Sequence, residues 1–278
     1  MSLRAEISAV LAELDQHPRK RLGQHFMIDA GVLADLVATG AVQPGSRVLE
    51  IGPGTGVLTR RLLAAGAEVC AVELDQDLGP WLAASLADES KFTLVQGDAL
   101  VSKSKLHPAI EAFAAADDWL LVANLPYDVS IPLVLNCLSL PRPPQQVSVT
   151  VQLEAAERLC AMPGTANWGA SAAVAQSSGS GRVARKVPAR SFWPQPRVVS
   201  AILAWTPERS VPEGFGRWCR DLFAYRRKRL TRALRDLGVD RAHAATACEQ
   251  AGLDPERRVE ELAVAELVAL QAAASGRE

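Results

Sequence analysis

The sequence predicts an α/β fold in which a mostly parallel sheet, covered by helices, is followed by a small helical domain. Three observations predict it. Five short apolar segments alternate with segments of helical spacing between residues 47 and 153, a glycine-rich turn follows the first of them, and the strand pattern stops near residue 207. Short apolar strands separated by helices are typical of a parallel sheet buried on both faces. We therefore expect one domain over residues 1–206 and a helical domain over 207–278.

The elements before the sheet are helical. Residues 5–15 have amphipathic helical spacing, which His17-Pro18 interrupts, and residues 30–40 return to that spacing. Between them lies a basic loop that begins at Arg19-Lys20-Arg21. Pro44-Gly45 is a turn signal and marks the start of the sheet region.

The predicted strands and helices then alternate along the chain. The strands of the parallel sheet are expected at 47–52, 68–74, 92–96, 119–125 and 146–153, and the helices between them at 57–65, 77–86 and 132–140. Residues 183–187 and 201–205 flank a proline-rich loop and are expected as an antiparallel pair at the sheet edge. The helical domain is expected to contain helices near 215–237, 241–251 and 260–273.

Composition excludes several classes of protein. The chain has 278 residues, of which 49% are hydrophobic and 22% charged, so it is not of the disordered class. No apolar run approaches the roughly 18 residues that a membrane span needs, and the N-terminal segment lacks a signal-peptide core. The five cysteines and four histidines are scattered. We therefore expect a cytoplasmic protein without disulfides or a bound metal.

Charge is distributed unevenly along the chain. The net charge is −1, yet residues 182–235 contain fourteen Lys or Arg against three Asp or Glu. A second basic cluster is Arg19-Lys20-Arg21. Such segregation often marks a surface that faces a polyanion. The alternative is that these charges lie on ordinary solvated helix faces.

A glycine-rich turn follows the first predicted strand, in the sequence Glu50-Ile51-Gly52-Pro53-Gly54-Thr55-Gly56. Glycines let a ligand approach the backbone closely, and the following helix N-terminus supplies N–H groups. The alternative is a tight strand-to-helix turn with no ligand.

Acidic residues end the next two predicted strands. Glu73 could accept hydrogen bonds from ribose hydroxyls, which serves both dinucleotides and S-adenosylmethionine. Asp98 could hold an adenine amino group, or it could be a helix N-cap before Ala99. The glycine spacing separates the two ligand classes, because the dinucleotide pattern G-x-G-x-x-G is not met. The E-x-G-x-G-x-G pattern with two strand-end acids resembles class I methyltransferases and argues against a nicotinamide dehydrogenase.

The fourth predicted strand runs into Asn124-Leu125-Pro126-Tyr127. The side-chain carbonyl of Asn124 and the backbone carbonyl of Leu125 could both accept from a planar exocyclic amine and orient its lone pair toward a methyl donor. Tyr127 could stack on the base, an interaction worth about 1–3 kcal/mol. No strong general base is needed, so catalysis would depend on orientation. The base must be looped out or single-stranded to enter. The alternative is a proline-fixed turn with a core tyrosine.

In order and spacing, these motifs resemble the KsgA family of ribosomal RNA adenine dimethylases from about Lys20 to Leu270. The resembling segments are K-R-L-G-Q-H-F (20–26), V-L-E-I-G-P-G-T-G (48–56), V-E-L-D (72–75), G-D-A-L (97–100), N-L-P-Y-D-V-S-I-P (124–132), F-W-P-Q-P-R-V-V-S-A (192–201) and R-R-K-R-L-T-R-A-L (226–234). The resemblance implies a Rossmann-like methyltransferase sheet. It also implies dimethylation of two adjacent adenosines near the 3′ end of small-subunit (16S) rRNA, by a monomer acting on the pre-30S subunit.

The resemblance also implies roles for matching residues. The methyl donor S-adenosylmethionine would contact His25, Met27, Gly52, Gly54, Glu73, Asp98 and Asn124, and the target adenine would lie between Tyr127 and Phe192. Phosphate contacts are expected from Arg19, Lys20, Arg21, Arg226, Arg227, Lys228 and Arg229.

The chain departs from the family pattern at several positions. His25 and Asp128 stand where the family usually has Asn, and Leu153 where a Lys is common. Two alternatives are kept on the same fold. One is an Erm-type enzyme that acts on large-subunit rRNA, and the other is a non-catalytic ribosome-assembly or nucleic-acid-binding protein.

Overall fold

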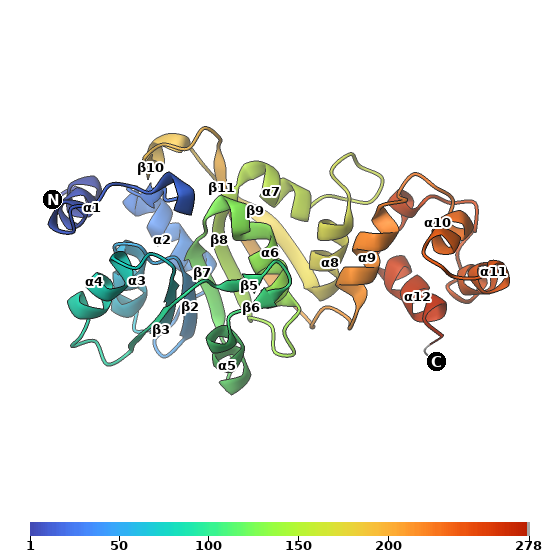
Figure 1. Ribbon diagram of the computed structural model, residues 1–278, viewed down its shortest axis with the longest axis horizontal. Helices are drawn as coiled ribbons and strands as arrows, with labels where there is room; N and C mark the ends of the chain where they lie inside the picture. Colours follow the sequence, from blue (N-terminus) through green and yellow to red (C-terminus); the bar gives the residue numbers. More distant parts are fainter. Residues whose placement is uncertain (277–278) are drawn as a thin grey trace. The chain divides into compact units, whose positions relative to one another are not determined.

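A seven-stranded sheet organises the N-terminal part of the chain (Figure 1). The structure, a computed structural model, describes residues 1–276. The strand order is β4-β3-β2-β7-β8-β11-β9, with bounds β2 Arg47–Ile51, β3 Glu68–Glu73, β4 Phe92–Gln96, β7 Leu120–Asn124, β8 Gln146–Gln152, β9 Gly179–Val187 and β11 Ser200–Pro207. The strands from β4 to β8 are parallel, and β11 runs antiparallel to β8. The predicted fold class is confirmed.

The sheet reverses its direction of growth between β2 and β7. From β2 the chain adds β3 and β4 on one side, then returns to add β7 and β8 on the other. In open α/β sheets the crevice beyond the carboxyl ends of the strands at such a reversal is where ligands bind. The turn after β2 and the turn after β7 are therefore expected to line a site.

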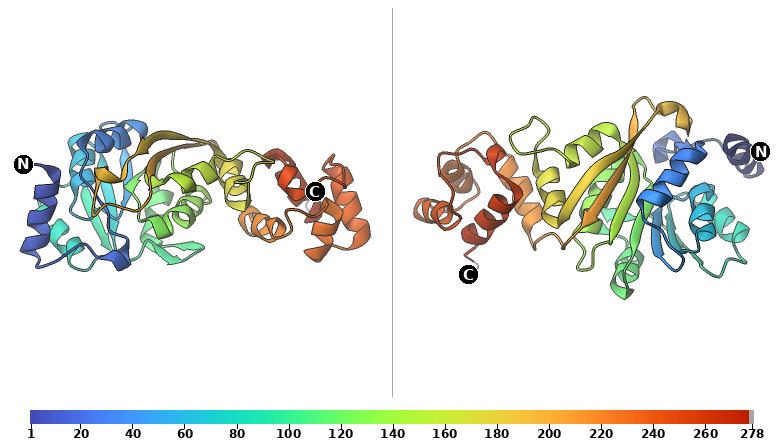
Figure 2. Two further views of the ribbon diagram at one scale, coloured as in Figure 1. Left: turned by 90° about the horizontal axis from the view of Figure 1, so that it is seen from above. Right: turned by 180° about the vertical axis from the view of Figure 1, so that it is seen from behind.

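Helices cover both faces of this sheet (Figure 2). They are α2 Ala30–Thr39, α3 Val57–Ala64, α4 Leu78–Ser85, α5 Pro108–Ala116 and α6 Tyr127–Leu138. Helix α1 Leu3–Glu13 precedes them and adds Ile7, Val10 and Leu11 to the core. Helix α2 packs on β7 and β8, α3 on β3, and α4 on β4. Their apolar faces enter a core with the sheet that includes Leu33, Leu36, Val48, Leu62 and Val122, all fully buried.

Helix α6 begins five residues earlier than predicted. Pro126 is its N-cap residue with φ −59° and ψ 133°, and Pro132 lies inside the helix. Proline has no backbone N–H, so Pro132 removes one helical hydrogen bond. The predicted helix start at Pro132 is therefore wrong. The structure therefore places Tyr127 in the first helical turn, directly after the end of β7.

The chain divides into two compact units. The first comprises Met1–Ala156 and Gly181–Pro207, and the second comprises Glu157–Ser180 and the residues from Glu208 onward. We expected residues 157–180 in the first domain. They belong to the second unit because α8 (Ala170–Ser178) packs against α9 (Phe215–Phe223) and α12 (Val264–Ala274).

The second unit is helical, as predicted, but the single helix expected near 215–237 is two helices. Helix α9 ends at Phe223 and α10 spans Leu230–Asp236, followed by α11 Arg241–Gln250. The intervening turn is held by long-range backbone bonds, from the Leu230 amide to Arg257 and from the Glu260 amide to Arg226. Helical spacing alone could not reveal these contacts. The basic run 226–229 consequently lies in a turn.

Strand β9 leaves no space for a side chain at Gly181. A Cβ added there would overlap the ring of Trp205 on β11, which is fully buried. We expect Gly181→Ala to lower the free energy of unfolding by about 1–3 kcal/mol, the usual cost of overpacking a core. Denaturant unfolding measures it. As a control, Gly216→Ala in α9 brings its new methyl no nearer than 3.9 Å to Val174. That variant should be neutral or more stable, because alanine favours the helix. Equal stability of Gly181→Ala and the wild type would contradict the packing.

Candidate active site

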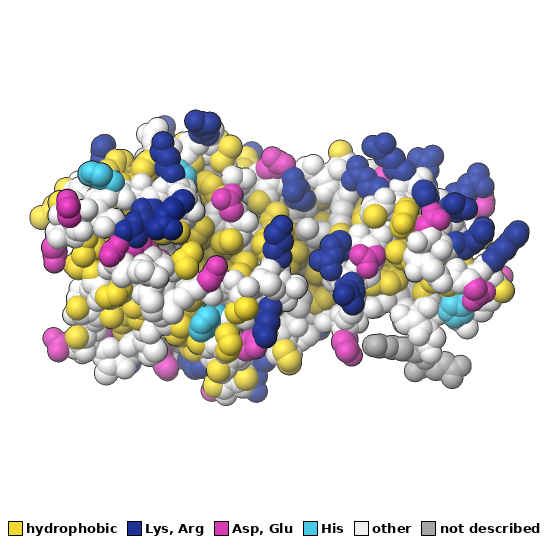
Figure 3. All heavy atoms as spheres, viewed as in Figure 1, with side chains coloured by type: hydrophobic (Ala, Val, Ile, Leu, Met, Phe, Trp, Pro, Cys, Tyr) yellow, Lys and Arg dark blue, Asp and Glu magenta, His cyan; other side chains and the backbone are white. Residues whose placement is uncertain are grey.

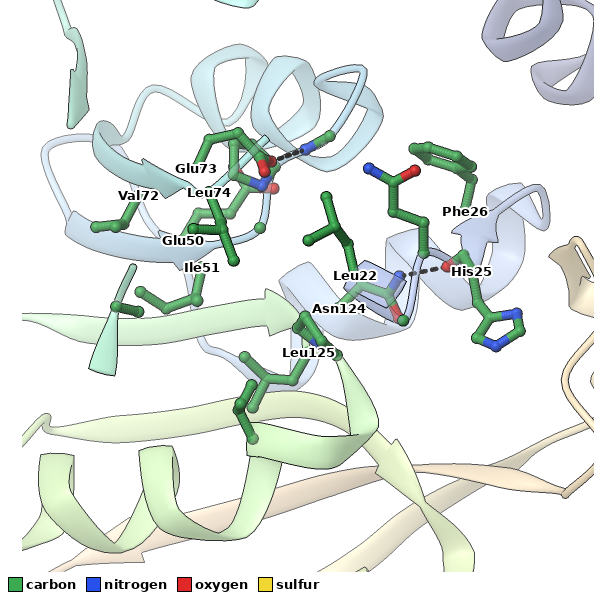
Figure 4. A pocket seen from close by; sticks show the side chains of 18 of the residues that line it. Leu22, His25, Phe26, Glu50, Ile51, Val72, Glu73, Leu74, Asn124 and Leu125 are labelled. Carbon is green, nitrogen blue, oxygen red and sulfur yellow. Dashed lines mark hydrogen bonds between the residues drawn. The ribbon is translucent and has the colours of Figure 1, made fainter. Parts of the chain in front are cut away.

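A cavity of about 200 Å³ lies where the carboxyl ends of β2, β3 and β7 meet (Figure 4). It is in the first unit, at the sheet reversal. Its lining includes every residue proposed from the sequence for the methyl donor and most of those proposed for the target amine: His25, Met27, Gly52, Gly54, Glu73, Asp98, Asn124, Leu125, Pro126 and Tyr127. The structure thus brings together residues that are up to 102 positions apart in the chain.

The glycine-rich turn has a backbone that only glycine adopts readily. Gly52, Gly54 and Gly56 have φ values of 69°, 58° and 78°. In addition, a Cβ at Gly54 would lie 3.0 Å from the ring of Phe26, so the cradle between the turn and Phe26 is narrow. The turn therefore needs glycine for its shape as well as for close approach of a ligand.

Glu73 is held at the end of β3 by two backbone amides. Its Oε2 accepts from the Gly54 amide at 2.9 Å and its Oε1 from the Asp75 amide at 2.7 Å. The first of these bonds joins the turn after β2 to the end of the adjacent strand β3 (Figure 4). Burial raises the pKa of this carboxyl, and the amide hydrogen bonds oppose the shift. The oxygens are fixed beside the cavity, where they can also accept from ligand hydroxyls.

Glu50, at the end of β2, is a buried acid that was not predicted from the sequence as a site residue. It exposes 1% of its surface and lines the cavity, and Thr59 Oγ1 donates to its Oε2 at 2.7 Å. Burial raises the pKa of Glu50 to about 8, and the nearby Glu73 carboxylate adds to the shift. An acid inside an otherwise apolar strand was the signal that could have singled it out.

Asn124 is the last residue of β7, and its amide orientation is set by the neighbouring N-terminal arm (residues 16–27). Its Nδ2 donates to the backbone carbonyl of His25 at 3.0 Å (Figure 4). With the amino group used in this way, the side-chain oxygen is the atom left to accept a hydrogen bond from a ligand amine. This orientation agrees with the acceptor role predicted for Asn124 from the sequence.

Tyr127 contacts the arm through its ring and β11 through its hydroxyl. The hydroxyl lies 2.6 Å from Oγ of Ser200, and burial raises the pKa of the phenol. The ring is stacked on the ring of His25, with centroids 5.5 Å apart and 24° between planes. The Nδ1 atom of His25 is 2.7 Å from the carbonyl oxygen of Pro194. His25 thus contacts Asn124, Tyr127 and Pro194 at once.

The structure does not bring Phe192 to the cavity. It belongs to β10 (Phe192–Trp193), which pairs antiparallel with β1 (Phe26–Met27), and its side chain is 1% exposed within the core. Strand pairing between segments far apart in sequence buries it, and the motif gave no sign of that pairing. In this structure Phe192 is not placed to stack on a base beside Tyr127.

Asp98 lies at the cavity but is not a helix N-cap. Its Oδ1 accepts from the Leu100 amide at 2.9 Å, and Leu100 begins the short strand β5 (Leu100–Ser102), which pairs with β6 (Lys105–Leu106). The side chain is exposed. It is thus positioned by a tight turn.

The basic residues proposed for RNA differ in exposure and in their partners. Lys20 and Arg21 are exposed, and so are Arg227, Lys228 and Arg229 in the second unit. Four of the seven pair with acids of the same chain: Arg19 with Asp75 and Asp77, Arg226 with Glu260, Lys228 with Asp236 and Arg229 with Glu256.

No cluster of three or more His, Cys, Asp or Glu side chains within residues 1–276 is arranged to hold a metal ion. Within the same residues, no helix has the length and apolar character of a membrane span.

Comparison with known proteins adds a family to this geometry. The family description "Ribosomal RNA adenine dimethylase" matches residues 16–274. The chain is 39% identical over 267 residues to a Ribosomal RNA small subunit methyltransferase A of Synechococcus sp. (strain JA-3-3Ab), covering 91% of this chain and 92% of the relative. It is 40% identical over 261 residues to the protein of the same name from Novosphingobium aromaticivorans, covering 90% and 91%.

Two solved structures share the fold. A dimethyladenosine transferase from Plasmodium falciparum superposes with a TM-score of 0.68 at 21% identity, covering 88% of this chain and 96% of the other. The 23S rRNA methyltransferase ErmE superposes with a TM-score of 0.64 at 22% identity, covering 90% and 99%.

The buried Glu50 predicts a pH-dependent stability. Its pKa of about 8 in the folded chain exceeds the ordinary value of 4.5, so the folded state binds the proton more tightly. Stability from this group is complete below about pH 4.5 and falls by up to about 1.4 kcal/mol per pH unit as the pH rises to about 8. Glu50→Gln, which mimics the protonated acid, should lose this decline.

The measurement is denaturant unfolding of both proteins between pH 5 and 8.5, without ligand. The stability of the wild type relative to Glu50→Gln should fall across this range. The exposed Glu89→Gln serves as a control and should show no such trend. Parallel pH profiles for wild type and Glu50→Gln would mean that Glu50 is ionised throughout.

Proposed function

The chain belongs to the ribosomal RNA adenine dimethylase family, and from this premise we propose that it dimethylates N6 of two adjacent adenosines near the 3′ end of small-subunit (16S) rRNA. The observation that carries the proposal is the fixed amide of Asn124 at the end of β7, beside the cavity. The names of the similar proteins support the small subunit as substrate.

The cavity fits S-adenosylmethionine as methyl donor. The narrow glycine cradle beside Phe26 would receive its amino acid end, Glu73 would accept from the ribose hydroxyls, and Asp98 from the adenine amino group. When bound, S-adenosylmethionine supplies an electrophilic methyl group on a sulfonium centre. The chain has only to orient the accepting nitrogen and exclude water.

Asn124 would orient the target amine. Its side-chain oxygen accepts one N–H, and the backbone carbonyl of Leu125 is proposed to accept the other. Two in-plane acceptors hold the amine so that its lone pair points out of the base plane, toward the donor. The proton leaves after methylation, when the nitrogen is cationic, so no basic side chain is required at this place.

Tyr127 is proposed as the stacking surface for the adenine. Because its ring and that of His25 are already in contact, a base cannot lie between them in this arrangement. The base must either use the other face of Tyr127 or displace the His25 ring. A contribution of Phe192 would require β10 to separate from β1.

The second unit is proposed to dock on the ribosomal subunit. Lys and Arg side chains gather over it in Figure 3, and Arg227, Lys228 and Arg229 are exposed in one turn. Such a surface suits phosphate contacts, which fix register without reading sequence. Lys20 and Arg21 of the first unit are proposed to meet RNA as well. We propose that the enzyme acts as a monomer in the cytoplasm.

Label mapping separates this function from its alternatives. Under-methylated small and large ribosomal subunits are incubated with radiolabelled S-adenosylmethionine, and the label is mapped. We expect dimethyladenosine at two adjacent positions of small-subunit rRNA. Label in large-subunit rRNA would support the Erm-type alternative, and the absence of label would support a non-catalytic protein.

Loss of the Asn124 amide should remove catalysis. We expect Asn124→Ala to lower kcat by about 10²–10³, the size seen when one oriented transition-state contact is removed. Affinity for rRNA should be unchanged, because the basic surface is intact. Asn136→Ala is the matched control: its Nδ2 donates to Lys103 and Pro132 carbonyls, away from the cavity, and its kcat should stay near wild type. An active Asn124→Ala enzyme would refute the proposed mechanism.

The basic turn of the second unit should set the salt dependence of rRNA binding. Changing Arg227 and Lys228 to Gln removes two proposed phosphate contacts. The slope of log affinity against log salt should then become shallower by about 1.5, since each contact contributes about 0.7–0.9. The control pair is Lys91→Gln with Arg142→Gln. These residues precede β4 and β8, at the sheet edge opposite the cavity. An equal slope for the test pair and wild type would show that the turn faces away from RNA.

A further inference from the structure

The N-terminal arm forms one wall of the proposed donor cavity. Seven consecutive arm residues, 21–27, line it. In Figure 4, Leu22, His25 and Phe26 of the arm lie across the cavity from Glu73 and Leu74 at the end of β3. A donor therefore lies between the sheet and the arm, and the position of the arm decides how tightly the cavity encloses it.

A buried carboxylate ties this arm to the sheet. Asp75 exposes 3% of its surface, and its two oxygens accept from different arm residues. Its Oδ1 is 2.7 Å from Nη1 of Arg19, and its Oδ2 is 2.7 Å from Nε2 of Gln24. Each contact spans more than 50 positions of sequence. Asp75 thus joins the arm at two points.

The same carboxylate is connected to the donor site. Asp75 Oδ1 also accepts from the amides of Asp77 and Leu78, at the start of α4, at 3.0 and 3.3 Å. The Asp75 amide donates to Oε1 of Glu73, the acid proposed to hold the ribose. Arm, α4 and the ribose-binding carboxylate therefore share one hydrogen-bonded unit.

Arg19 uses both terminal nitrogens of its side chain, and its backbone amide, for contacts within this hydrogen-bonded unit. While Nη1 contacts Asp75, Nη2 donates to Oε1 of Gln16 at 2.6 Å and pairs with Asp77. Its backbone amide donates to Oε1 of Gln24 at 2.8 Å. Its neighbours Lys20 and Arg21 are exposed. The basic triplet 19–21 therefore contains one arginine that is ion-paired within the chain and two residues that are exposed to solvent.

We propose that Arg19 and Asp75 are positioning residues for the methyl-donor site, whose ion pair, with Gln24, holds the arm closed over the bound donor. The inference rests on the proposed function for the identity of the donor. Release of the donor past the arm requires these contacts to break. Weakening them speeds donor dissociation and lowers donor affinity. The bond from Asn124 to the His25 carbonyl and the pairing of β1 with β10 remain, so the Asn124 amide keeps its orientation. Arg19 is thus removed from the set of RNA contacts expected from the sequence.

The test measures donor binding without RNA, by titration calorimetry and by stopped-flow displacement with S-adenosylhomocysteine. Arg19→Gln should weaken S-adenosylmethionine binding about tenfold through faster dissociation, the scale of one charge-assisted hydrogen bond lost. Arg19→Lys, which keeps the charge, should recover part of this. In a cycle with Asp75→Asn, the double variant should lose less than the sum of the two single losses, because both remove the same contact.

Two readouts separate positioning from a general structural role. With saturating rRNA, Arg19→Gln should raise KM for the donor while kcat at saturating donor stays within about twofold, which marks a lost binding contact. A variant that was merely misfolded would lose kcat and melting temperature together. Arg19→Gln should disturb folding less than Asp75→Asn, because the side chain of Arg19 is 22% exposed and that of Asp75 is 3% exposed.

Lys20→Gln provides the matched comparison. Lys20→Gln should reduce the salt dependence of rRNA binding and leave donor affinity unchanged. Arg19→Gln should lower donor affinity and leave the salt dependence of rRNA binding unchanged. Wild-type donor affinity in Arg19→Gln, together with a reduced salt slope, would overturn the proposal and make Arg19 a phosphate contact. Failure of the wild type itself to bind S-adenosylmethionine would instead refute the proposed function, and the inference with it.

Discussion

The reversal of strand order between β2 and β7 is the constraint on which the site depends. Parallel strands end at the same edge, and at the reversal the turns after β2 and β7 lead to opposite sides and leave a crevice. The glycine turn, Glu73 and Asn124 are far apart in sequence but each follows a strand of this group. Their convergence is a consequence of topology, because each residue needs only to follow a strand that ends at this edge.

The N-terminal arm forms the wall of the cavity that the sheet does not supply. Strand ends supply only one wall, and the second wall consists of residues 21–27. The arm is fixed at three places: by the Asp75 contacts, by the bond from Asn124 to the His25 carbonyl, and by pairing of β1 with β10. The second of these also determines which atom of Asn124 faces the cavity. The arm therefore orients the Asn124 amide as well as lining the cavity.

Features set by local pattern could be predicted from the sequence, and features set by distant contacts could not. The apolar strands, the glycine turn and the strand-end residues Glu73, Asp98 and Asn124 follow from short segments. The burial of Phe192 depends on pairing with Met27, 165 positions away, and no local pattern encodes it. The same holds for the break between α9 and α10, which depends on backbone bonds to residues 257–260. The start of α6 was misplaced because a proline inside a helix resembles a proline at its beginning.

Arg19 illustrates why charge in a sequence is ambiguous. Three adjacent basic residues predict one polyanion-facing cluster, since a charge run is usually solvated. In the folded chain, the half-buried guanidinium of Arg19 makes directed hydrogen bonds to the buried Asp75 and to Asp77, whereas its exposed neighbours Lys20 and Arg21 keep their charge available to a partner. What separates the two situations is the acid at position 75, two residues beyond Glu73. Basic residues near a nucleotide pocket should therefore be assigned to RNA only after their intramolecular partners have been identified.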